Sequence, residues 1–249
     1  MIRFLNVRKS FGPKTVLDGF TLDVPDQQTT VLLGFSGSGK SVTLKHIVGL
    51  LEPDEGSVEV DGQVVHQLGR DAVVELRGTI GYVFQFAALL DSLTVAENVA
   101  LGLVSRGLDP DIVEGRIEES LRLVELPDAG SRYPAELSGG MRKRVGIARA
   151  IALRPRYILY DEPTTGLDPV TSAVIDELMV RTKHELGVTG VVVTHDMRSA
   201  FRVGDRIAML YQGRVRTVGT VAEIRATEDP LVRQFIEGRP PSPSAWERG

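Results

Sequence analysis

The chain has 249 residues, enough for one large domain or a domain with a lobe. It contains no cysteine, which excludes disulfides and thiolate metal sites. The formal net charge of −4 points away from nucleic acid as a partner. No stretch approaches the ~18 apolar residues of a membrane span, and residues 1–6 turn polar too early for a signal peptide. We therefore expect a cytoplasmic protein that reaches a membrane only through a partner.

Alternating apolar and polar residues predict β-strands within residues 1–30 and 56–66, with a hairpin turn at Asp61–Gly62. Between them an apolar run at 31–33 is followed by GFSGSGKS and then by apolar residues at helical spacing. A glycine-rich loop therefore joins a buried strand to a helix.

This loop fits the pattern G-x-x-x-x-G-K-[ST]. Glycines let successive backbone N–H groups turn toward an anion, and the positive end of the helix points at the same place. Lys40 would reach the β- and γ-phosphates of a nucleotide, and the Ser41 hydroxyl would bind Mg²⁺. We expect ATP to be held by Gly34, Phe35, Ser36, Gly37, Ser38, Gly39, Lys40, Ser41 and Val42.

Two residues outside the loop are candidates for the same site. The strand-like segment 79–84 leads to Gln85, whose amide oxygen could reach Mg²⁺ and the attacking water. Phe11 comes before Gly12 near the N-terminus. Two interpretations of Phe11 stay open: it stacks on adenine, or it is an ordinary core phenylalanine.

Residues 86–152 are predicted to form a helical lobe, with an apolar stripe at Ile117, Leu121 and Val124 and a helix start at Asp109–Pro110. A later segment of the lobe, LSGGM at 137–141, precedes the basic run 142–144. At least one of these basic residues is expected on a solvated helix face.

Ser138 in LSGGM is a typical helix N-cap, so the helix start there offers a second anion site. One glycine-rich loop already suffices for one ATP. The second site is therefore expected to serve another chain, with two copies enclosing two ATP molecules head to tail through Ser138, Gly139 and Gly140.

Two further strands are predicted to end at the same sheet edge. The run 157–160 leads to Asp161, and the run 190–194 leads to His195. Asp161 would hold Mg²⁺ through water, and Glu162 would polarise the attacking water. His195 would contact the γ-phosphate and link it to Glu162, although a lone histidine at a strand end is commonly an ordinary surface residue.

The remaining elements follow from helix and turn signals. Asp168–Pro169 predicts a helix that ends at Gly187, in which Asp168 would be the N-cap. A hairpin is expected across 205–219, and a short helix from Asp229–Pro230.

The segments GFSGSGKS, LSGGM, YILYDEP, GLD and TH occur in the order seen in ABC transporter ATPases, and the chain resembles that family over nearly its whole length. The resemblance implies an α/β P-loop NTPase fold: a RecA-like core with a mostly parallel sheet, an antiparallel β subdomain and a helical signature subdomain, together spanning residues 1–238. It also implies an ATP-gated homodimer that drives an integral membrane permease from its cytoplasmic face. Asp168 would contact the opposite site, which is compatible with an N-cap role.

The family pattern ends its signature with Gln where this chain has Met141. Hydrolysis should survive this departure, because Ser138, Gly139 and Gly140 carry the phosphate contacts. A chromosome-maintenance ATPase would place a long coiled coil between Lys40 and Ser138, so the sequence favours a transporter.

The segments GSGKSVTLKHIVGLLEPDEG, FQFAALLDSLTVAENVALGL, LSGGM and PLVRQFIEG resemble MlaF-type ATPases, which serve MCE-linked phospholipid transport. This resemblance implies a lipid cargo, an MlaE-type permease, an MCE (MlaD-like) protein and a small adaptor. An ABC ATPase for another small-molecule cargo is the alternative.

The same resemblance bears on two other parts of the chain. The permease would press on the region of Phe86, Leu89, Leu90 and Leu93, about half of which would instead belong to the core of the lobe. Residues 239–249 are rich in Pro and Ser, which favours an extended, mobile tail. In MlaF-type proteins a C-terminal extension packs across the dimer, so Trp246 could instead anchor on the partner subunit.

Overall fold

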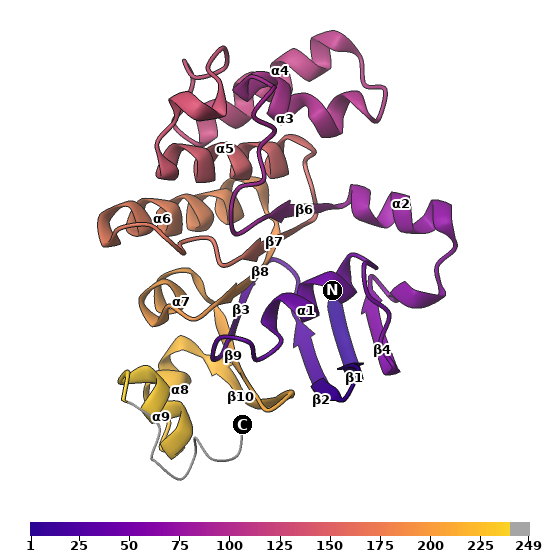
Figure 1. Ribbon diagram of the computed structural model, residues 1–249, viewed down its shortest axis with the longest axis vertical. Helices are drawn as coiled ribbons and strands as arrows, with labels where there is room; N and C mark the ends of the chain where they lie inside the picture. Colours follow the sequence, from indigo (N-terminus) through magenta and orange to yellow (C-terminus); the bar gives the residue numbers. More distant parts are fainter. Residues whose placement is uncertain (240–249) are drawn as a thin grey trace.

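The computed structural model describes residues 1–239, and the proposed anchor Trp246 lies outside that range (Figure 1). The strands are β1 (Ile2–Phe11), β2 (Lys14–Val24), β3 (Thr29–Leu33), β4 (Glu55–Val60), β5 (Gln63–Val64), β6 (Ile80–Val83), β7 (Tyr157–Asp161), β8 (Thr189–Thr194), β9 (Arg206–Tyr211) and β10 (Arg214–Thr220). The helices are α1 (Lys40–Ile47), α2 (Arg70–Gly78), α3 (Val95–Val104), α4 (Pro110–Leu123), α5 (Gly139–Ala152), α6 (Pro169–Leu186), α7 (Met197–Val203), α8 (Val221–Arg225) and α9 (Pro230–Ile236).

A six-stranded sheet in the order β10-β9-β3-β8-β7-β6 forms the centre of the molecule. Its strands pair in parallel except for β10, which runs antiparallel to β9. The carboxyl ends of parallel strands share one edge of a sheet, where ligands bind in open α/β folds. The glycine-rich loop after β3, Asp161 at the end of β7 and His195 after β8 therefore meet at that edge.

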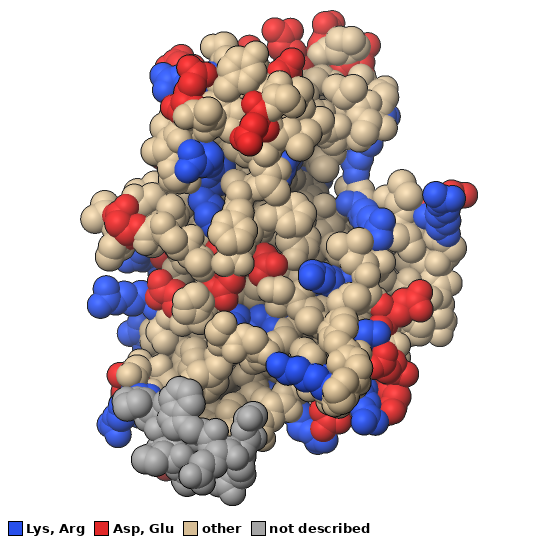
Figure 2. All heavy atoms as spheres, viewed as in Figure 1, with Lys and Arg blue, Asp and Glu red and all other residues tan. Residues whose placement is uncertain are grey.

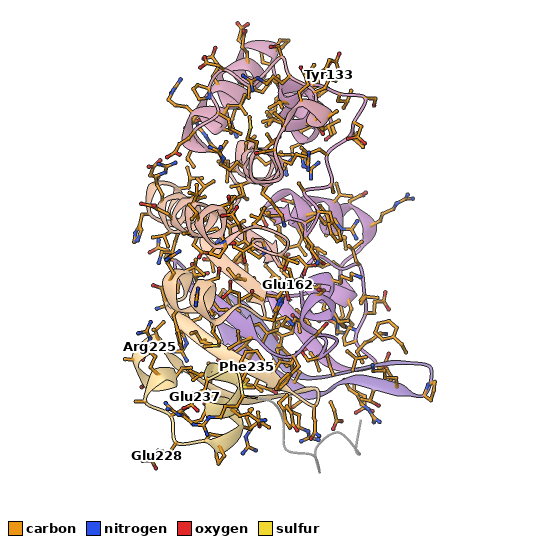
Figure 3. The ribbon with its side chains drawn as sticks, turned by 60° about the vertical axis from the view of Figure 1, so that its left-hand side comes forward. Tyr133, Glu162, Arg225, Glu228, Phe235 and Glu237 are labelled. Atoms are coloured by element: carbon orange, nitrogen blue, oxygen red, sulfur yellow. The ribbon has the colours of Figure 1, made fainter. Side chains whose placement is uncertain are left out.

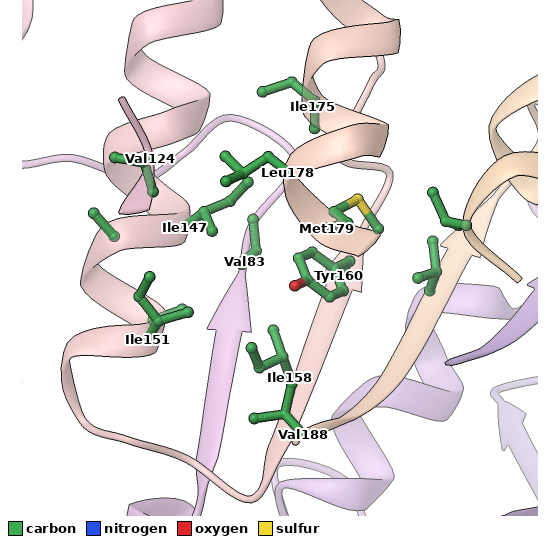
Figure 4. Packing of buried hydrophobic residues seen from close by; sticks show 14 of the residues in the cluster. Val83, Val124, Ile147, Ile151, Ile158, Tyr160, Ile175, Leu178, Met179 and Val188 are labelled. Carbon is green, nitrogen blue, oxygen red and sulfur yellow. The ribbon is translucent and has the colours of Figure 1, made fainter. Parts of the chain in front are cut away.

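Successive residues of the central strands face two separate cores, because side chains alternate along a strand. On β7, Ile158 and Tyr160 pack with buried residues of α5 and α6, such as Ile147 and Leu178 (Figure 4). Leu159, between them, faces the opposite core, which is formed by α1 and the antiparallel strands. Burial on both faces explains the continuous apolar runs of these strands.

A second, antiparallel sheet in the order β2-β1-β4-β5 covers the side of α1 (Figure 1). Helices α3, α4 and α5 pack together at the upper end of the molecule, within the stretch 86–152. The predicted fold class is thus confirmed, with a mostly parallel sheet, an antiparallel sheet and a helical region.

The predicted helix starts and turns also occur in the structure. Asp109 and Asp229 cap α4 and α9, each followed by Pro at the first helical position. Gly187 ends α6 in a left-handed conformation, with φ at 64°. The hairpins turn at 61–62 and 212–213.

Charged side chains of both signs are interspersed on the face shown in Figure 2, with acidic residues gathered at the upper end over α4. No helix within residues 1–239 is both long and apolar enough to cross a bilayer.

Candidate active site at the carboxyl edge of the sheet

The loop between β3 and α1 turns closely against its neighbours, and two glycines make this possible. Gly39 has a φ of 105°, and a Cβ there would lie 2.8 Å from Val16 Cγ1. A Cβ at Gly34 would lie 2.7 Å from the carbonyl oxygen of Leu210. These distances leave no room for a side chain, so the glycines of the sequence pattern meet a requirement of this backbone.

Lys40 is the first residue of α1, and the loop's own backbone holds its side chain. The ammonium donates hydrogen bonds to the carbonyl oxygens of Gly34 and Phe35 at 2.9 and 3.1 Å. It also lies 3.4 Å from Oε1 of Glu162, and the Lys40 side chain is only 6% exposed. A buried ammonium needs such partners. The loop therefore presents a fixed positive charge where the phosphates of ATP are expected.

Asp161, at the end of β7, meets the start of α1. Its Oδ1 accepts a 2.7 Å hydrogen bond from the Ser41 hydroxyl, and its Oδ2 accepts one of 3.1 Å from the Tyr82 hydroxyl. Hydroxyl and carboxylate oxygens suit Mg²⁺, which takes few protein ligands when substrate phosphates and water supply the others. Within residues 1–239, no cluster of three or more His, Asp or Glu side chains could hold a metal ion. The donor set therefore fits a Mg²⁺ ion that is shared with a nucleotide.

Tyr82 on β6 was not predicted as a site residue. Its ring stacks on Phe84, with centroids 4.4 Å apart. Burial raises the pKa of Tyr82, and the charge of Asp161 raises it further. The phenol therefore stays protonated and donates to the carboxylate. In the sequence, only its place on the strand that leads to Gln85 indicated that Tyr82 could belong to the site.

Glu162 has a left-handed backbone conformation, with φ at 48°. Such a conformation costs a non-glycine residue of the order of 1–3 kcal/mol and is typical of functional sites. Its Oε2 accepts a 3.2 Å hydrogen bond from the Thr165 hydroxyl and lies 2.9 Å from Nδ1 of His195. The expected contact between Glu162 and His195 is therefore present, near the middle of the molecule in Figure 3.

Lys40, Glu162 and His195 border one pocket of about 360 Å³, which Asp161 does not line. Phe11, at the end of β1, forms part of its wall and is 46% exposed, so the interpretation of Phe11 as a core residue is wrong. The pocket is lined by Phe11, Val16, Ser36, Gly37, Gly39, Lys40, Ser41, Val42, Gln85, Glu162 and His195. The structure thus brings Phe11 and most of the predicted loop residues together and adds Val16, whereas Gly34, Phe35 and Ser38 do not line the pocket.

The predicted second anion site lies outside this pocket. Ser138 caps α5, and its hydroxyl oxygen accepts a 3.2 Å hydrogen bond from the N–H of Met141. Gly139 begins the helix, and a Cβ at Gly140 would lie 2.6 Å from Thr171 Cγ2. Ser138 and Gly139 are exposed to solvent. Within one chain the structure does not bring them to Lys40.

Asp168 also lies outside the pocket and is the N-cap of α6, as predicted. Its Oδ1 accepts hydrogen bonds from the N–H groups of Val170 and Thr171 at 2.9 and 3.0 Å. The pKa of Asp168 is lowered, mainly by a hydrogen bond from the Thr171 hydroxyl. The carboxylate is therefore anionic and fixed at the surface.

The basic run 142–144 is only partly a solvated helix face. Arg142 is exposed, as expected of at least one member, whereas Lys143 is only 7% exposed. The Lys143 ammonium donates hydrogen bonds to the carbonyl oxygens of Gln85 and Glu162, the second at 3.4 Å. Burial lowers the pKa of Lys143. This lysine joins α5 to the segments that carry Gln85 and Glu162.

Replacing Lys143 with Met should lower the free energy of unfolding by about 1–3 kcal/mol, because two inward-facing carbonyl groups would lose their donor. Urea unfolding at neutral pH measures the change. Lys45→Met is a matched control, because Lys45 lies exposed on α1; its effect should stay within about 0.5 kcal/mol. Equal stability of the Lys143→Met variant and the wild type would contradict a structural role for these bonds.

Comparison with known proteins identifies the family. The model of the ABC transporter family matches residues 17–165. The sulfate/thiosulfate import ATP-binding protein CysA of Synechocystis sp. is 42% identical over 234 residues, which cover 93% of this chain and 64% of CysA. The probable ribonucleotide transport ATP-binding protein mkl of Mycobacterium leprae is 37% identical over 239 residues, 96% of this chain and 69% of mkl. The chain thus spans about two thirds of the length of these curated relatives.

Solved ATP-binding cassettes share the fold. The dimeric, post-hydrolysis structure of MJ0796 bound to ADP and Pi matches with a TM-score of 0.80 and 36% identity, covering 89% of this chain and 99% of MJ0796. cbiO1 of Clostridium perfringens, part of the ABC transporter complex cbiONQ, matches with a TM-score of 0.85 and 28% identity, covering 94% of this chain and 93% of cbiO1. The chain therefore belongs to the ABC transporter family, as an ATPase cassette that uses Mg·ATP.

Proposed function

We propose that this chain is the ATP-hydrolysing subunit of an ABC transporter, and that two copies close around two Mg·ATP to drive a membrane permease. The observation that carries this proposal is the division of the candidate site residues between two surfaces. Lys40 and Glu162 border the pocket, whereas Ser138 and Asp168 lie outside it. A second copy turned head to tail would bring its Ser138 to the phosphates held by Lys40. MJ0796, which shares the fold, is itself dimeric with ADP and Pi bound.

In this proposal, Lys40 and the loop amides bind the phosphates, and Ser41, Asp161 and Gln85 hold Mg²⁺. When bound, Mg²⁺ neutralises charge that develops on the phosphate oxygens. Glu162 accepts a proton from water as the water oxygen attacks the γ-phosphorus, and ADP leaves. The residues act mostly by positioning and by charge stabilisation, as phosphoryl transfer requires.

Three further residues complete the proposed site. His195 orients the Glu162 carboxylate from 2.9 Å and reaches toward the γ-phosphate. The exposed ring of Phe11 offers a surface on which adenine can stack. Asp168, fixed at the start of α6, contacts the opposite site in the dimer.

We further propose a phospholipid or other lipid as the cargo, with an MlaE-type permease, an MCE protein and a small adaptor at the cytoplasmic face of a membrane. The support is the resemblance of segments around the glycine-rich loop, residue 85 and the signature with Met141. The relatives favour a second candidate function, the transport of another small molecule. CysA and mkl are named for sulfate/thiosulfate import and ribonucleotide transport.

The proposed permease contact lies just after Gln85. Phe86 is 85% exposed and Leu90 is 49% exposed. Leu89, in contrast, packs against the core that contains the buried residues of α5 and α6. Of the four predicted positions, Phe86 and Leu90 are therefore exposed and form the proposed docking surface, whereas Leu93 is half-buried.

Replacing Phe86 with Asp should remove this docking surface. We expect the variant to lose the permease on purification from native membranes, while the isolated chain keeps its ATPase activity. Val74→Asp is the matched control, because Val74 is 64% exposed on α2, away from the proposed contact. Co-purification of the permease at the wild-type level would contradict the proposed docking surface.

Purification of the tagged chain from gently solubilised native membranes tests the cargo. Mass spectrometry would identify the proteins and lipids that come with it. An MlaE-type permease with an MCE protein and phospholipid is the expected result. A permease of another class would leave the ATPase assignment in place and overturn the lipid proposal.

A further inference from the structure

An aromatic contact joins the glycine-rich loop to the C-terminal helix of the described chain. The rings of Phe35 and Phe235 meet edge to face, with centroids 4.9 Å apart and an angle of 87° between their planes. Tyr211, at the end of β9, lies 6.4 Å from the Phe35 ring. Figure 3 shows Phe235 on the side of α9 that faces the body of the protein, whereas Glu228, which precedes the helix, lies at the outer edge of the molecule. Aromatic pairs in this geometry attract each other beyond the burial of their surface.

The ring and the carbonyl group of Phe35 have different surroundings. The side chain of Phe35 does not line the nucleotide pocket but lines a neighbouring one together with Tyr211. Its carbonyl oxygen, in contrast, accepts hydrogen bonds from the ammonium of Lys40 at 3.1 Å and from the N–H of Ser38 at 3.2 Å. The ring that contacts α9 and the oxygen that fixes Lys40 therefore belong to the same residue.

Helix α9, which carries Phe235, is anchored to the rest of the protein. Asp229 caps the helix, and its Oδ2 accepts a 2.8 Å hydrogen bond from Nε of Arg216 on β10. Val232 is 1% exposed and belongs to the same core as the buried residues of α5 and α6. These contacts fix the helix that carries the Phe235 ring.

We propose that Phe235 is a positioning residue for ATP. Through Phe35 it holds the carbonyl that fixes Lys40, and nucleotide binding and the docking of α9 therefore stabilise each other. Such coupling is reciprocal by thermodynamic linkage. The inference rests on the proposed assignment of ATP to the pocket, and it adds a route by which the C-terminal helix controls nucleotide affinity.

A double-mutant cycle on the full chain tests this proposal, with the dissociation constant of Mg·AMP-PNP as the readout. Phe35→Ala and Phe235→Ala should each weaken binding by about 2- to 12-fold, the range expected for one aromatic pair. The double variant should bind no more weakly than the weaker single variant, because both remove the same contact. Glu228→Gln, at an exposed position just before the helix, should bind as the wild type does.

A second readout separates positioning from general loss of structure. AMP-PNP should slow amide hydrogen exchange of residues 231–238 in the wild type but not in the Phe35→Ala variant. Phe235→Leu replaces Phe235→Ala if the latter does not fold. Wild-type affinity in the Phe235 variant, additive losses in the double variant, or an equal loss in Glu228→Gln would overturn the inference. Failure of the wild type to bind AMP-PNP would instead overturn the proposed function on which it rests.

Discussion

Replacing Glu162 with Gln is expected to lower the rate of ATP hydrolysis by about 10²- to 10⁴-fold, the contribution typical of a general base. The amide oxygen of Gln can still accept the hydrogen bond from Thr165. It cannot take a proton from the attacking water. Phosphate release at saturating Mg·ATP measures the rate, and equilibrium binding should show that affinity for Mg·ATP is retained.

Glu114→Gln provides the matched control for this substitution, because Glu114 is exposed on α4 and has no place in the proposed mechanism. Its rate should equal that of the wild type. Hydrolysis by the Glu162→Gln variant at the wild-type rate would show that another group activates the water.

Replacing Lys40 with Met is expected to weaken Mg·ATP binding by at least about 30-fold. The ammonium is buried and already fixed by two carbonyl oxygens, so it meets the phosphates without further ordering. Removing one member of a buried, hydrogen-bonded charge pair generally costs 2 kcal/mol or more, which corresponds to about this factor. Calorimetric titration with Mg·ATP gives the affinity.

Lys45→Met serves as the control on the same helix, because Lys45 is exposed. It should change the affinity for Mg·ATP by less than about threefold. If the Lys40→Met variant bound Mg·ATP as tightly as this control, the phosphates would not lie against Lys40.

The core of the site could be predicted because its determinants are local in the sequence. Gly34 and Gly39 stand where the loop backbone excludes a Cβ, and Lys40 follows at the helix start. Asp161 ends an apolar run whose burial on both faces marks a central parallel strand. Local residue type and strand position together place these groups at one sheet edge.

Other contacts could not be predicted, because they join segments that are distant in the chain. Lys143 looks like a member of an exposed basic run, and only the packing of α5 against the sheet buries it. Tyr82 gains its partner Asp161 from the neighbouring strand β7. The contact between Phe35 and Phe235 depends on where α9 returns to the glycine-rich loop. No spacing rule in the sequence encodes these pairings.

Phe11 shows how exposure decides between two interpretations that the sequence leaves open. An aromatic residue near the end of a strand has the same local pattern whether it faces a core or a pocket. In the structure its ring is 46% exposed and borders the same pocket as Lys40 and Ser41. In the proposed dimer, the contribution of Ser138 comes from a second copy.

In the proposed mechanism, Mg·ATP joins two copies through Ser138. The most direct test measures the mass in solution of the Glu162→Gln variant by light scattering, with and without Mg·ATP, and repeats it with Ser138→Arg added. We predict that Mg·ATP doubles the mass from the 27.1 kDa of one chain in the single variant and leaves the double variant monomeric. A single variant that stays at the mass of one chain, or a double variant that dimerises equally well, would contradict the account.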